Sequence, residues 1–219
     1  MTPRAFLRAL LSPLLAAGSG LFAQTTIEGT VQLPKPPPDP GVNERYQVAD
    51  QPIAPANPPA AVVYLTGDFS RMTLPASRHT AQMPQKNMTF APDLVAVLVG
   101  TTVEFPNLDD MYHNVFSYSK AKRFDLGRYR KDEKPGSVLF DKPGTVTVHC
   151  DIHDRMRGTV LILDTPFFVK TDSQGHYRLE HLPVGTYSLK AWVTDRDTRE
   201  HLVEVKNGPG VLHVDFPEK

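Results

Sequence analysis

The chain has 219 residues, enough for one large domain or two modest ones. Lys and Arg together number 24, as do Asp and Glu, so the formal net charge is zero. This balance argues against a nucleic acid as partner, because nucleic-acid-binding domains carry an excess of positive charge.

The first 23 residues have the features of a secretory signal peptide. Arg4 and Arg8 precede an apolar run over residues 9–16, and small residues follow as far as Ala23. The apolar run is too short for a permanent membrane span. We therefore expect cleavage after Ala23 and export to the periplasm or out of the cell. A membrane-anchoring helix is the alternative.

Two candidate strands precede the middle of the chain. Residues 26–33 alternate apolar and polar side chains, which is the period of a half-buried strand, and residues 60–65 form a second apolar run. The segment between them is rich in proline. Proline is excluded from the interior of a sheet and favours extended, water-exposed backbone, so we interpret residues 33–59 as mainly a surface loop.

Strand patterns continue through the middle of the chain. A turn at residues 100–102 separates candidate strands at 95–99 and 103–105, and a turn with acidic residues then leads to His113 at the start of the next strand. Residues 119–134 hold seven Lys or Arg residues. Such a charged run is usually a solvated loop, and steering of an acidic redox partner is the alternative.

The most distinctive stretch is a predicted strand, loop and strand. Residues 145–150 alternate, residues 160–163 are apolar, and between them lie Cys150, His153 and Met156. A thiolate, an imidazole and a thioether within seven residues form a soft ligand set of the kind that copper prefers. Zinc fits less well, because thioethers are poor zinc ligands.

His113 is the candidate for one further ligand. Two His and one Cys in a trigonal arrangement, with a weak axial Met, form the blue-copper electron-transfer site. Cys150 is the only cysteine. In an exported protein it cannot form an internal disulfide, and a free thiol there is open to oxidation unless a metal binds it. An inert buried Cys150 and a core Met156 are the alternatives.

The other six histidines are interpreted as surface or structural residues. His149 neighbours Cys150 on a strand, so its side chain points to the opposite face. The other five show no ligand-like spacing: His79, His176, His181, His201 and His213. The absence of a His-x-His motif argues against a multicopper oxidase. Since no nucleophile–base pair has a recognisable spacing either, we expect no enzymatic activity.

The stretches GTTVEFPNLDDMYHNVF and FDKPGTVTVHCDIHDRMRGTVLIL resemble the cupredoxins, the family of plastocyanin, pseudoazurin and amicyanin. The resemblance is closest to bacterial plastocyanin-like proteins that are often labelled methylamine-utilisation proteins. It implies one copper per chain, and it implies the following ligands: His113, Cys150, His153 and Met156. It also implies that the side chain of Asn114 ties the two ligand loops together. Arg155 and Arg157 depart from the family, in which many members are apolar at these positions.

Strand patterns resume after residue 164. An Asp-Ser-Gln-Gly turn at residues 172–175 separates two candidate strands, and alternating side chains follow at 187–191. The pattern TD..G.Y.LEHLPVGTYSLKAW resembles the small carboxypeptidase-regulatory or collagen-adhesin B-type sandwich, which is transthyretin-like. Members of that family begin with strands similar to residues 26–33 and 60–65, which here precede the copper-binding region.

We therefore expect an all-β protein, in which a cupredoxin-like Greek-key sandwich is inserted in, or joined to, a second small β-sandwich. The expected divisions are a signal peptide (1–23), N-terminal strands with the proline-rich loop (24–77), a copper domain (78–164) and the rest of the second sandwich (165–219). In the alternative division, residues 165–219 form that sandwich alone and residues 24–77 are a separate extension.

The expected function is that of a periplasmic type 1 copper protein that carries single electrons between redox proteins. Two other functions use the same residues differently. One is a copper-binding carrier or store without redox partners. The other is an extracellular structural or adhesion module in which the metal site is vestigial.

Overall fold

The computed structural model describes residues 25–35, 57–69 and 80–218. The predicted signal peptide and most of the proline-rich loop lie outside these residues. In this part of the chain the regular structure consists of strands, which confirms the all-β prediction. The described residues include no helix long and apolar enough to cross a membrane.

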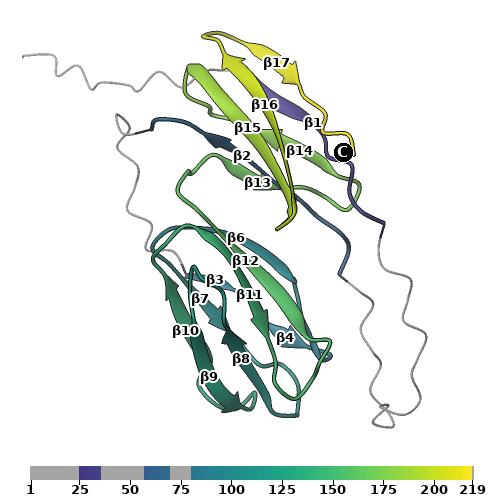
Figure 1. The fold of residues 1–219 in the computed structure, drawn as a ribbon, viewed down its shortest axis with the longest axis vertical. Helices are drawn as coiled ribbons and strands as arrows, with labels where there is room; N and C mark the ends of the chain where they lie inside the picture. Colours follow the sequence, from purple (N-terminus) through teal and green to yellow (C-terminus); the bar gives the residue numbers. More distant parts are fainter. Residues whose placement is uncertain (1–24, 36–56, 70–79, 219) are drawn as a thin grey trace, which may run out of the picture.

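One sandwich occupies residues 80–163, in the lower half of Figure 1. Its larger sheet has the strand order β6-β12-β11-β8-β9, and its smaller sheet has the order β10-β7-β3. The larger sheet consists of β6 (Leu94–Leu98), β12 (Arg157–Leu163), β11 (Gly144–His149), β8 (His113–Ser117) and β9 (Phe124–Tyr129). The smaller sheet consists of β10 (Gly136–Phe140), β7 (Thr101–Phe105) and β3 (Thr80–Gln82). A short hairpin of β4 (Gln85–Lys86) and β5 (Thr89–Phe90) stands beside them.

The alternating pattern of residues 145–150 produces the inner strand of this sandwich. Val146 and Val148 are fully buried, whereas Thr145 and Thr147 are only half-buried. β11 pairs antiparallel with β12, and the last pair in the register is His149 with Arg157. The loop that carries Cys150, His153 and Met156 therefore joins two paired central strands at one end of the sandwich.

The remaining strands form two further sheets, in the upper half of Figure 1. The first sheet, in the order β14-β1-β17, consists of β14 (His176–Leu179), β1 (Thr25–Thr30) and β17 (Gly210–His213). The second, in the order β13-β2-β15-β16, consists of β13 (Phe168–Lys170), β2 (Val62–Thr66), β15 (Gly185–Thr194) and β16 (Asp197–Val205). The two strands that precede the lower sandwich thus pair with strands that follow it, for example Ile27 with Leu179 and Val63 with Ala191.

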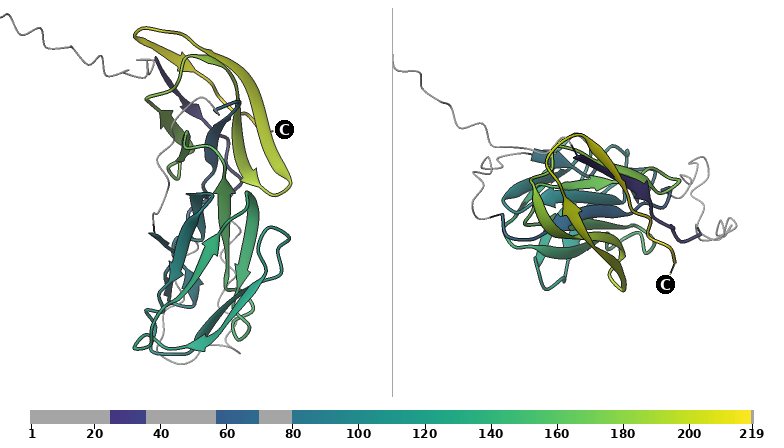
Figure 2. Two further views of the ribbon diagram at one scale, coloured as in Figure 1. Left: turned by 90° about the vertical axis from the view of Figure 1, so that its left-hand side faces the viewer. Right: turned by 90° about the horizontal axis from the view of Figure 1, so that it is seen from above.

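The two halves of the molecule are stacked end to end (Figure 2). A separate apolar cluster joins them: Leu94, Leu161 and Leu163 from the lower half pack with Val62 and Trp192 from the upper half. This cluster is distinct from the core of either half. The upper half is therefore attached at the end of the lower sandwich opposite to the Cys150 loop.

The interpretation of residues 119–134 as a solvated loop is wrong for its central part. Residues 124–129 form β9, the edge strand of the larger sheet, which pairs antiparallel with β8. Phe124 and Leu126 pack against the core while charged residues alternate with them on the outer side. The prediction rested on the number of charged residues and did not consider these two apolar side chains. Their packing against the core places this strand in the sheet.

Candidate metal centre

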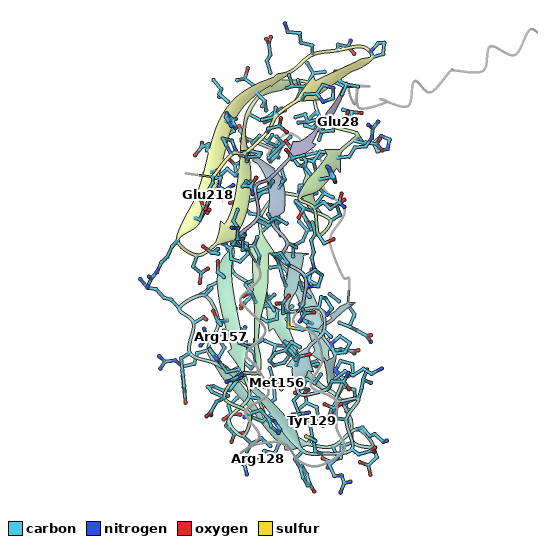
Figure 3. The ribbon with its side chains drawn as sticks, turned by 90° about the vertical axis from the view of Figure 1, so that its right-hand side faces the viewer. Glu28, Arg128, Tyr129, Met156, Arg157 and Glu218 are labelled. Carbon is cyan, nitrogen blue, oxygen red and sulfur yellow. The ribbon has the colours of Figure 1, made fainter. Side chains whose placement is uncertain are left out.

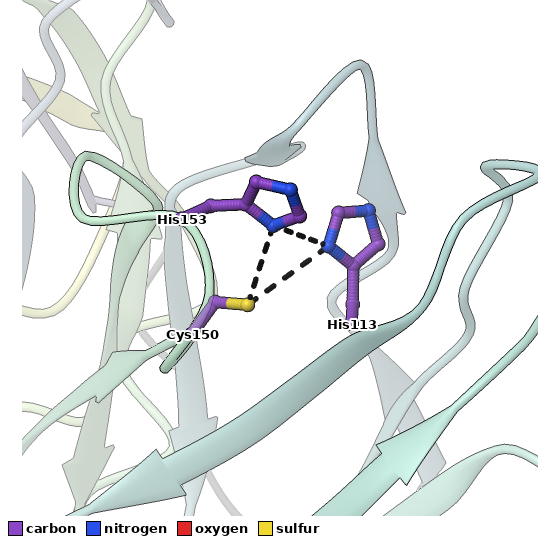
Figure 4. Close-up of side chains that lie close together, drawn as sticks. All are labelled: His113, Cys150 and His153. Carbon is purple, nitrogen blue, oxygen red and sulfur yellow. Dashed lines mark hydrogen bonds between the residues drawn. The ribbon is translucent and has the colours of Figure 1, made fainter. Parts of the chain in front are cut away.

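Three side chains converge at the end of the lower sandwich (Figure 4). His113 begins β8, Cys150 directly follows β11, and His153 lies in the loop that leads to β12. The Nδ1 atoms of the two histidines are 3.1 Å apart, and Cys150 Sγ lies 3.9 Å from His113 Nδ1 and 3.5 Å from His153 Nδ1. His113 and Cys150 are buried, and His153 is half-buried.

Met156 lies in the same loop, which is closed by its own backbone. The amide of Met156 donates to the carbonyl of His153 at 2.9 Å, and the amide of Cys150 donates to the carbonyl of Met156 at 3.2 Å. The Met156 side chain is 1% exposed and belongs to the same core cluster as Cys150. Figure 3 shows it at the end of the molecule far from Glu28. The loop therefore places Met156 in the interior of the lower sandwich, directly before β12.

The spacing of the three ligand atoms suits a metal ion. A triangle with sides of 3.1, 3.5 and 3.9 Å has a point about 2 Å from every corner, and metal–nitrogen and metal–sulfur bonds are about 2.0–2.3 Å long. The donors are two imidazole nitrogens and a thiol sulfur. This donor set and this spacing fit copper.

The surroundings favour the metal-binding form of the thiol. Burial raises the pKa of the Cys150 thiol, but His113 and the backbone amides of Asn114 and Ile152 lower the pKa by more, so that it lies below its ordinary value. Burial and the neighbouring His113 lower the pKa of His153. A thiolate and a neutral imidazole are the forms that bind metals.

Asn114 connects the two segments that carry the ligands. Its side-chain oxygen accepts a hydrogen bond from the amide of Asp151 at 2.8 Å, and its side-chain nitrogen donates to Asp125 at 3.2 Å. Asp151 directly follows Cys150, and Asn114 directly follows His113. The hydrogen bond to Asp151 therefore fixes the distance between the backbone segments that bear two of the candidate ligands.

Asp109 is a residue of the site that the sequence interpretation did not identify. Its Oδ2 lies 2.9 Å from Nε2 of His113, on the side of the ring away from Cys150. Burial raises the pKa of Asp109, but the amides of Met88 and Asn87 and the imidazole of His113 lower it by more. The available signal was an acidic residue four positions before a candidate ligand, in a turn that was treated only as a connection.

The remaining described histidines lie away from this group. The ring of His149 packs against Phe116, with the ring centres 5.6 Å apart, on the outer side of the larger sheet. The other four are exposed: His176, His181, His201 and His213. His79 lies outside the described residues. In the described part of the chain, the group of His113, Cys150 and His153 is the only one in which three His, Cys, Asp or Glu side chains could share a metal.

Comparison with known proteins gives a match for this half of the molecule. Residues 78–163 match the family described as copper binding proteins, plastocyanin/azurin family. No match was found among curated protein sequences.

Solved structures similar to this chain include two amicyanin variants and a purple cupredoxin from Nitrosopumilus maritimus. A Cu(I) amicyanin variant is 25% identical and a reduced variant is 29% identical; each match covers 38% of this chain and 82% of the amicyanin, with TM-scores of 0.36 and 0.35. The purple cupredoxin is 22% identical, over 38% of this chain and 98% of its own, with a TM-score of 0.34. These TM-scores are low, so the likeness of residues 78–163 to copper-binding proteins rests on the sequence match.

Proposed function

We propose, from the membership of residues 78–163 in the plastocyanin/azurin family of copper-binding proteins, that this protein carries single electrons between redox proteins. The observation that carries the proposal is the convergence of two imidazole nitrogens and the Cys150 sulfur at a spacing that suits one metal ion. One such group implies one copper per chain.

His113, Cys150 and His153 would hold the copper through strong bonds, and Met156 would supply a weaker thioether ligand. Bound copper supplies a one-electron couple between Cu(I) and Cu(II). The protein contributes a fixed geometry, because His113 and Cys150 are buried and Asn114 joins their backbone segments. A ligand set that is held in one arrangement in both oxidation states needs little rearrangement when an electron moves.

The proposed exchange of electrons uses the end of the sandwich near His153. His153 is half-buried, and three exposed apolar side chains lie in the segments around the ligands, namely Leu108, Tyr112 and Ile152, with 51%, 48% and 38% exposure. A redox protein that docks on these side chains would approach the copper closely.

A copper carrier or store is the second candidate, and the burial of the site weighs against it. His113 is 0% exposed, Cys150 5% and Met156 1%, so a recipient protein could reach only His153 without opening the fold. Periplasmic or secreted localisation remains part of the proposal. It is supported by the signal-peptide pattern of residues 1–23.

The test is the metal content and visible spectrum of the purified protein. We expect one copper per chain, an intense thiolate-to-copper charge-transfer band in the oxidised form, and reversible bleaching by one electron. Cys150→Ser should abolish the band, whereas His176→Ala, a substitution of an exposed histidine, should leave it unchanged. A colourless protein that holds stoichiometric zinc would contradict the proposal, and copper bound without reversible oxidation would favour the carrier.

A further inference from the structure

We propose that Asp109 is a positioning residue of the metal centre, which fixes the ring of His113 and lowers the reduction potential of the bound copper. This inference rests on the proposed function. Its first support is the contact of 2.9 Å between Asp109 Oδ2 and Nε2 of His113. The opposite nitrogen of the ring, Nδ1, is the one that faces Cys150 and His153.

The carboxylate of Asp109 is itself held in place. Its Oδ1 accepts a hydrogen bond from the amide of Asn87 at 2.8 Å, and its Oδ2 accepts one from the amide of Met88 at 3.0 Å. The side chain is 8% exposed. Since both oxygens accept hydrogen bonds from backbone amides, the carboxylate cannot rotate away from His113 without breaking these hydrogen bonds, each of which contributes about 1 kcal/mol.

The two donor amides belong to a two-residue hairpin turn. Asn87 and Met88 connect β4 to β5 and have φ angles of 54° and 58°, in the left-handed region that side chains other than glycine rarely adopt. A two-residue hairpin turn of type I′ requires positive φ angles at both central residues. Here it directs two consecutive N–H groups at a single carboxylate. The turn therefore presents two hydrogen-bond donors to Asp109.

The support extends to the backbone on both sides of Asp109. The amide of Gln85 donates to the carbonyl of Pro106, and the amide of Leu108 donates to the carbonyl of Gln85, both at 2.8 Å. The side chain of Asn107 accepts from the amide of Asp109 at 2.9 Å and donates to the carbonyl of Met111 at 2.8 Å. The turn that ends at His113 is thus braced along its length.

The contact with Asp109 determines which nitrogen of the His113 ring is free to bind a metal. A proton on Nε2 that is donated to Asp109 leaves Nδ1 as the unprotonated nitrogen, which is the metal-binding form. The anion also favours the more highly charged Cu(II) over Cu(I), which lowers the reduction potential. His153 differs, because its Nε2 has no hydrogen-bond partner within the described part of the chain. His113 is thereby the anchored ligand and His153 the accessible one.

The experiment compares Asp109→Asn with Asp110→Asn, a matched change at the next residue. Both remove one carboxylate charge, but the side chain of Asp110 is 74% exposed and pairs with Lys131, so water and salt screen it. We expect Asp109→Asn to change the ratio of Cu(II) to Cu(I) affinity at least tenfold, which raises the reduction potential by about 59 mV for one electron. Asp110→Asn should shift it by much less. Equal shifts in the two variants, or no shift in Asp109→Asn, would overturn the inference.

A measurement on the unsubstituted protein covers the case in which Asp109→Asn does not fold. In the diamagnetic Cu(I) form, proton NMR should show the Nε2–H of His113 protected from exchange with water and that of His153 exchanging rapidly. Equal rapid exchange at both histidines would overturn the inference. If the wild-type protein takes up no copper, the proposed function itself is contradicted. If the wild-type protein is coloured and Asp109→Asn has the same reduction potential, only the proposed role of Asp109 is contradicted.

Discussion

Both halves of this molecule contain buried polar side chains, but these side chains differ in what they contact. In the upper half, Arg199 is 6% exposed, and its guanidinium donates to the carbonyls of Gln32 and Phe216 and pairs with Asp197 at 2.6 Å. The carboxylate of Asp197 and the two carbonyl groups compensate the positive charge of the guanidinium. In the lower half, His113, Cys150 and His153 direct their ligand atoms at one another. A β-sandwich can thus use buried polarity to join strands or to hold a metal.

The contacts within the upper half and the contacts between the two halves also differ in chemistry. Arg199 joins the segments that follow β1 and β17, so it stabilises the pairing of strands distant in sequence. The junction between the halves is apolar and includes Trp192 and Leu161. We therefore propose that the halves behave as two structural units, one that binds metal and one that does not, held together by the junction. The following predictions test this division, beginning with the largest expected effect.

Replacement of Arg199 should have the largest effect, and it should be confined to stability. Arg199→Met removes the guanidinium that pairs with Asp197 and donates to the carbonyls of Gln32 and Phe216, and breaking a buried ion pair costs up to about 3–5 kcal/mol. Urea unfolding should show this loss, and the visible copper band should not move. Arg196→Met, at an exposed neighbour, is the control. A displaced copper band in Arg199→Met would show that the halves are not independent.

Removal of copper should weaken only the lower half. A ligand present at a thousand times its dissociation constant stabilises the folded state by about 4 kcal/mol. Hydrogen exchange should therefore become faster in β8, β11 and β12 of the copper-free protein, with β15 and β16 unchanged. Equal acceleration in β15 and β16 would mean that the chain unfolds as a single unit.

Truncation at the junction should uncouple the two units. Trp192 is 9% exposed, and replacing a buried Trp by Ala costs about 3 kcal/mol at the lower end of the usual range. Calorimetry of Trp192→Ala should then resolve two transitions, and only one of them should shift when copper is removed. Val211→Ala, at a side chain that is 53% exposed, should leave the melting profile unchanged. A single transition in Trp192→Ala would contradict two separable units.

Substitution of Met156 should have the smallest effect and should appear only in the potential. Met156→Leu should keep copper and colour, because the three strong ligands remain, and should raise the reduction potential, because loss of a weak donor disfavours Cu(II). A tenfold change in relative affinity corresponds to about 59 mV. Met156→Gln should lower the potential, since oxygen is a harder ligand. Identical potentials in all three proteins would make Met156 a core residue only.

Several parts of the fold could be predicted from local sequence. Alternation at residues 145–150 and the apolar run at 160–163 predicted the central hairpin, and both became strands. The same reasoning placed His113 at the start of a strand, as the structure has it. These predictions succeed because a strand's period and a short loop are set by a few consecutive residues.

Charge patterns were less informative. Residues 119–134 were interpreted as a loop from their Lys and Arg content. However, Phe124 and Leu126 pack against the core, and the segment that contains them forms the edge strand β9. The role of Asp109 was missed for a related reason. An acidic turn is usually exposed, and only the β4–β5 turn, which is about 20 residues away in sequence, shows that this carboxylate is buried and held.

The sequence by itself determined the all-β class and a set of soft ligands within seven residues, because strand period and donor chemistry are local properties. Only the tertiary structure decided which distant segments meet. Thr30 donates to Asp215, 185 residues along the chain, and His113 approaches Cys150 across 37 residues. Such contacts depend on how the sheets pair and pack. Sheet pairing therefore brought His113 to the Cys150 loop, and packing of the β4–β5 turn against the acidic segment brought Asp109 to His113.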